Sequence, residues 1–186
     1  MEQLLVVLPI VAFLILATLF GLFLRRAGRL VAATRDVERF RRQASDLVSR
    51  AETSLSEICN RIDAVRRGQL SAAAVGDDLT ASIDAVERYA AEARELHPPV
   101  DGTRIRDDIA GELERAKRAL EMVEHGVTIQ ASARAGAREL EAQTAIKRGY
   151  LNVLHAREAI ARHSAAAAAM VAMDPARRAG AARRTI

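Results

Sequence analysis

Four histidines are the side chains in this 186-residue chain most suited to binding a metal, and their spacing does not favour a metal site. A di-iron helical bundle carries Glu-x-x-His motifs on facing helices. Met122, Asn152 and Ile160 stand three residues before the last three histidines, and a zinc-type His-Glu-x-x-His motif is absent. We therefore predict no metal ligands and expect surface or boundary positions for the histidines. These are His97, His125, His155 and His163.

Other candidate reactive groups have simpler structural interpretations. The single cysteine, Cys59, is either a nucleophilic or redox thiol or a small buried residue, and the absence of a histidine nearby in sequence favours burial. The acidic pairs 77–78 and 107–108 lie at expected helix starts, where the helix dipole already favours carboxylates. The chain has no glycine-rich phosphate loop, dinucleotide-binding fingerprint or nucleophile elbow. We predict no catalytic residue and no cofactor.

All the elements that carry these residues are predicted to be helices. From residue 30 to 67 apolar residues recur with a period of seven that drifts toward 3.6, and Gly68 then provides a helix stop. A second helix is expected at 71–97, with an alternative start at Gly76. The sequence HPPVDG at 97–102 predicts a reversal, followed by a helix at 103–131 that Thr103 would cap.

The end of this third helix is the least certain boundary. The stretch from Ala131 to Gly136 is the preferred break and Gly149 the rival position. A last helix would then cover 136–173 and end before Pro175, leaving a basic, disordered tail at 174–186. The predicted fold class is all-α: one N-terminal transmembrane helix followed by an antiparallel bundle of three to four long helices.

The transmembrane helix is expected at Leu4–Leu24, which holds 21 residues without a charge, 16 of them Leu, Ile, Val or Phe. A helix of that length rises about 31 Å, close to the thickness of a bilayer core. A cleavable signal peptide would have a basic start and a shorter apolar run. Arg25, Arg26 and Arg29 follow the run at 25–29, so the positive-inside rule places residues 1–3 outside and the body in the cytoplasm, at the cell membrane.

Charge is unevenly distributed along the chain. Residues 30–173 carry 21 basic and 22 acidic side chains, so the positive net charge resides in the two flanks. A nucleic-acid-binding body would carry a basic face, and we expect no nucleic-acid partner. The tail arginines are expected either to contact anionic lipid, together with the three arginines at 25–29, or to remain solvated. They are Arg177, Arg178, Arg183 and Arg184.

Two patterns allow the chain to pair with a copy of itself. Leu30, Val37, Phe40 and Leu47 form an apolar stripe that would be covered in a monomer and exposed in a self-associating stalk. Within the expected span, Ala17 and Gly21 form a small-x-x-x-small pair that allows close helix approach.

In plan, the chain resembles the peripheral-stalk b subunit of ATP synthase and the LemA-like membrane proteins. The turn HPPVDG departs from an uninterrupted stalk, and no residues typical of a LemA-like body are evident, so the sequence assigns no family. We expect a non-catalytic, membrane-anchored scaffold or regulator that binds a protein partner. The alternative is a coiled-coil stalk paired through the first helix, and an enzyme with an unmarked site is third.

Overall fold

The computed structural model describes residues 2–132 and 135–170. Within these ranges, the side chains of residues 2–15, 17, 22–24, 26–31, 33 and 135–137 are not described. The chain divides into two compact units, Arg39–Met170 and the remaining terminal segments, and each is considered by itself. The elements are α1 (Glu2–Arg66), η1 (Ala72–Val75), α2 (Gly76–Glu95), η2 (Val100–Gly102), α3 (Thr103–Ala131) and α4 (Ala135–Ala168).

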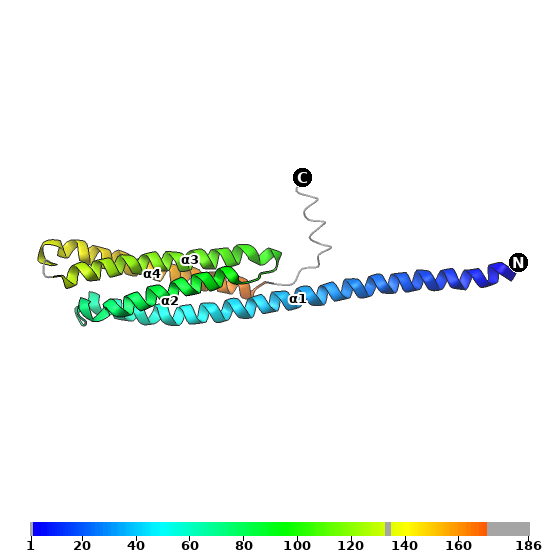
Figure 1. The fold of residues 1–186 in the computed structure, drawn as a ribbon, viewed down its shortest axis with the longest axis horizontal. Coiled ribbons are helices and arrows are strands. Elements are labelled where there is room, and N and C mark those ends of the chain that lie inside the picture. The colour runs from blue at the N-terminus through cyan, green and yellow to red at the C-terminus, as the bar shows by residue number, and fades with distance from the viewer. Residues whose placement is uncertain (1, 133–134, 171–186) are drawn as a thin grey trace, which may run out of the picture. The chain divides into compact units, whose positions relative to one another are not determined.

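The unit Arg39–Met170 is an antiparallel four-helix bundle (Figure 1). Side-chain contacts join α1 to α2, α2 to α3, α3 to α4 and α4 back to α1. In each of the first three pairs of helices, residue numbers increase along one helix as those of its contact partners decrease along the other, so the two helices run antiparallel. The contacts are Arg50–Glu92 and Arg61–Asp78, Arg94–Glu114 and Lys117–Glu87, His163–Asp108 and His125–Glu141, and the stacking of Arg66 on Tyr150. The expected all-α bundle is therefore confirmed.

The core of the bundle is built from one apolar stripe of each helix. Its largest fully buried side chains are Phe40, Leu47, Leu55, Ile58, Ile62, Leu79, Ile109, Leu113, Leu120 and Ile160. Alanines fill the positions between them, which allows the helix axes to approach closely because an alanine projects little beyond the backbone.

The turn after α1 depends on one glycine. Gly68 adopts φ +69°, a left-handed conformation that a side chain with Cβ rarely takes. The N–H groups of Gly68 and Gln69 donate to the carbonyls of Val65 and Ala64, which satisfies acceptors at the helix end. The chain then reverses through η1 into α2.

At the opposite end, the reversal HPPVDG brings three elements together. The Gly102 N–H donates to the Pro99 carbonyl over 2.7 Å, closing η2. A Cβ on Gly102 would lie 3.2 Å from both Phe40 Cε1 and Met170 Cε. The start of the α1 portion of the bundle, the α2–α3 reversal and the end of the described chain therefore share one end of the bundle.

The expected capping role of Thr103 is wrong. Thr103 already has helical angles, φ −58° and ψ −45°, and the N-cap is Gly102, with no side-chain capping hydrogen bond. The 3-10 turn η2 leads directly into α3, so the first helical residue lies where the sequence pattern placed the cap.

The break between α3 and α4 follows Ala131. Ser132 ends α3, with its N–H and its Oγ both donating to the Ile129 carbonyl. Gly149 lies inside α4, which contains one non-helical residue, Arg138, at φ −125° and ψ 19°. Gly149 is therefore not a helix stop but a close contact, since a Cβ at this position would lie 2.7 Å from the Ala119 carbonyl oxygen.

The expected span 4–24 lies within α1, and most of its side chains are outside the described residues. In the described part of the chain, no helix has the length and apolar character needed to cross a membrane.

Candidate functional site

The arginines expected to contact lipid are mostly outside the described part of the chain. The Arg25 side chain is described and exposed, whereas those of Arg26 and Arg29 are not described. Residues 177, 178, 183 and 184, the tail arginines, all lie outside the described residues.

The stripe expected to pair two chains is largely buried within a single chain. Phe40 and Leu47 are fully inaccessible members of the bundle core, Val37 is 5% exposed, and the Leu30 side chain is not described. Phe40 and Leu47 therefore offer no surface to a second copy of the folded chain. Gly21 is exposed, with open space around the position of a Cβ, and the Ala17 side chain is outside the described set.

Two histidines bridge α3 and α4 at their two ends. His163 Nδ1 lies 3.7 Å from Asp108 Oδ2, and His125 Nε2 lies 3.9 Å from Glu141 Oε1. Each contact pairs one imidazole with one carboxylate, and the described residues hold no group of three His, Cys, Asp or Glu side chains placed to bind a metal ion. The two contacts connect helices rather than assemble a reaction centre.

Cys59 is buried on α1, 3% exposed. Burial raises the pKa of its thiol, and the Arg157 guanidinium of α4 beside it acts in the opposite direction. A neutral, inaccessible thiol is a poor nucleophile because the thiolate is the reactive form.

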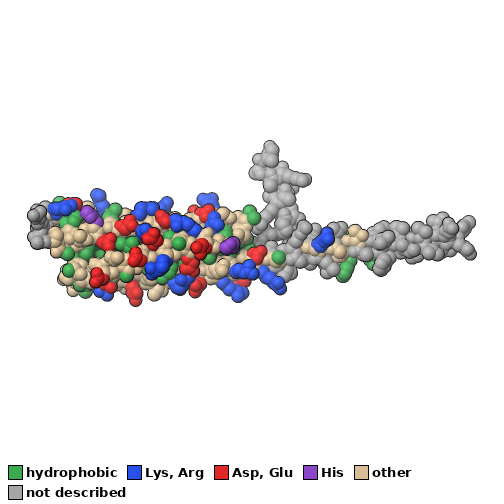
Figure 2. All heavy atoms as spheres, in the orientation of Figure 1, with side chains coloured by type: hydrophobic (Ala, Val, Ile, Leu, Met, Phe, Trp, Pro, Cys, Tyr) green, Lys and Arg blue, Asp and Glu red, His purple; other side chains and the backbone are tan. Residues whose placement is uncertain are grey.

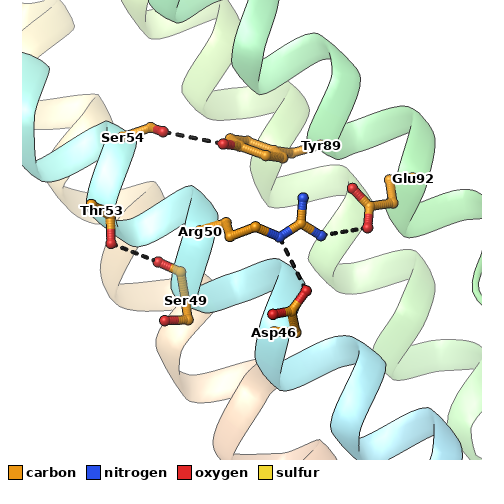
Figure 3. A network of polar contacts seen from close by, with 7 residues as sticks. All are labelled: Asp46, Ser49, Arg50, Thr53, Ser54, Tyr89 and Glu92. Carbon is orange, nitrogen blue, oxygen red and sulfur yellow. Dashed lines mark hydrogen bonds and ion pairs between the residues drawn. The ribbon is translucent and has the colours of Figure 1, made fainter.

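A polar network joins α1 and α2 on the surface (Figure 3). Arg50 donates to Asp46 on its own helix and to Glu92 on α2, and its guanidinium carbon lies 5.6 Å from the centre of the Tyr89 ring. The Tyr89 hydroxyl is 3.2 Å from Ser54 Oγ. The carboxylates raise the pKa of Arg50, with the Glu92 hydrogen bond the largest cause. Arginine stays protonated, so the network links the two helices through a cation and performs no proton transfer.

Figure 2 shows acidic and basic side chains intermingled over the visible face of the bundle, typical of a solvated surface. One of several surface grooves is lined by three arginines and one glutamate, and Glu114 and Glu158 pair with two of those arginines. It lies between α3 and α4 and has a volume of about 510 Å³. Its charged and imidazole-bearing lining residues are Arg115, Arg118, Arg162, His155 and Glu112.

The floor of this groove, which we call the α3–α4 groove, consists mainly of small residues. Ala119, Ala156 and Ala159 are almost fully buried there, and Met122 is 38% exposed. The sequence interpretation missed this groove because its lining depends on the register between α3 and α4. The spacing of Arg115, Arg118 and Met122 places them on one face of a helix and could have indicated it.

No family model, curated protein or solved structure matches this chain.

Proposed function

We propose that this protein is a non-catalytic scaffold or regulator, anchored in the cell membrane by residues 4–24, whose cytoplasmic helical bundle binds a protein partner. The observation that carries the proposal is the run of 21 uncharged residues at Leu4–Leu24. Its described large side chains support this: Leu16, Leu19 and Phe20 are 66%, 59% and 62% exposed in the isolated chain. Apolar side chains of this size that face outward from a helix favour a lipid or protein environment.

The expected orientation rests on the flanking charges. Arg25, Arg26 and Arg29 follow the span, whereas the other side has one acidic residue, Glu2. Basic flanks stay in the cytoplasm. The bundle that follows is then on the cytoplasmic side, with residues 1–3 outside.

The tail arginines belong to the same proposal. Met170, the last described residue, lies at the same end of the bundle as Phe40, since both surround Gly102. A chain that enters and leaves its bundle at one end can return its basic tail toward the anchor. Anionic headgroups would then stabilise the tail by roughly 1 kcal/mol per arginine near the surface.

A binding role suits the bundle better than catalysis. Its described ionisable side chains are mainly exposed and paired across or along helices, as in Arg50–Glu92 and Lys117–Glu87. Such exposed pairs add little stability and leave little perturbed acid–base chemistry for a reaction.

The orientation is tested with full-length chain carrying a reporter after Ile186. A reporter active only in the cytoplasm should be active, and the chain should stay in the membrane fraction after alkaline extraction. Changing Arg25, Arg26 and Arg29 together to Asn should weaken or invert the orientation. The matched control changes three bundle arginines, Arg61, Arg67 and Arg104, to Asn and should leave it unchanged. Release of the unmodified chain by alkali would disprove the anchor.

A further inference from the structure

We draw no further inference here: the strongest candidate, the polar groove lined by Arg66, Gln130 and Lys147 where α1 ends, carries no ligand site, because Arg66 is already paired with Asp63 and nothing in the structure shows what would occupy the groove.

Discussion

The α3–α4 and α1–α2 contacts are two solutions to the packing of antiparallel helices. Between α3 and α4, glycines let the backbones meet: a Cβ on Gly149 would lie 2.7 Å from the Ala119 carbonyl oxygen, and one on Gly126 would lie 2.8 Å from the Ala142 carbonyl oxygen. Between α1 and α2, polar side chains meet outside an apolar core, as in the exposed Arg50–Glu92 pair and the part-buried Ser54–Tyr89 pair (Figure 3).

The two contacts differ in the side-chain substitutions that each tolerates. A backbone cannot move away from an added methyl group without displacing its helix, whereas an exposed arginine can exchange a carboxylate for water. The α3–α4 contact should therefore be sensitive to the smallest change of side chain. The α1–α2 contact should depend on buried apolar residues and little on its polar network.

The largest effect is expected from the apolar part of α1. Leu55 is fully buried, so Leu55→Ala removes packed methyl groups and should cost about 2–5 kcal/mol of unfolding free energy. Urea denaturation of the full-length chain in mild detergent, followed by circular dichroism, measures the loss. Leu140→Ala is the control, since Leu140 is 79% exposed on α4 and should change stability by less than about 0.5 kcal/mol. Equal effects would contradict the assignment of Leu55 to the core.

The glycine contact is tested by one substitution made at two positions. In Gly149→Ala the new Cβ would meet Val123 Cγ2 at 2.5 Å, and neighbouring backbone atoms cannot give way. The steric cost should exceed the gain in helix propensity and leave a net loss of about 1–2 kcal/mol in urea denaturation.

Gly111→Ala is the matched control within a helix. Gly111 lies exposed in α3, with nothing within 4 Å of a built Cβ. Relief of the backbone entropy cost should stabilise the bundle by about 0.5–1 kcal/mol. A gain at both positions would show that α3 and α4 are not in backbone contact at Gly149.

The polar network of α1 and α2 should contribute little. Arg50→Met keeps an aliphatic side chain but removes the hydrogen bonds to Asp46 and Glu92 and the guanidinium over the Tyr89 ring. We expect no resolvable shift of the urea midpoint at physiological salt, because Arg50 is exposed and screened. A shift of the urea midpoint as large as that of Leu55→Ala would show that the α1–α2 contact depends on its polar network.

The smallest effect is a dependence on pH carried by Glu114. The hydrogen bond from Arg94 is the main cause that lowers the pKa of Glu114 below its ordinary value of 4.5. A lowered pKa in the folded chain adds stability above the unfolded pKa, and that stability is lost as the pH falls through the folded pKa. The advantage of the unmodified chain over Glu114→Gln should therefore diminish as the pH falls from 4.5 through the lowered pKa of the folded chain. Urea midpoints measured from neutral pH down to about pH 3 test this, and an advantage that grew on acidification would contradict it.

The sequence was informative wherever a local rule decides the conformation. Gly68 marked the end of α1 because only a residue without Cβ adopts φ +69° easily. Two prolines in HPPVDG excluded a continuous helix, and apolar periodicity identified the core stripe that includes Leu47 and Leu120. The cap at Thr103 failed because η2 adds a turn that no residue type in that stretch requires.

What the sequence by itself determined is the all-α class, a boundary at Gly68 and the apolar segment at Leu4–Leu24, because backbone conformation and transfer from water depend on neighbouring residues along the chain. Only the tertiary structure decided that Gly149 is a contact and not a break, and that Arg115, Arg118 and Arg162 line one groove. Both depend on the register between α3 and α4. That register is set by the fit of side chains on two helices, which no periodicity within one helix contains.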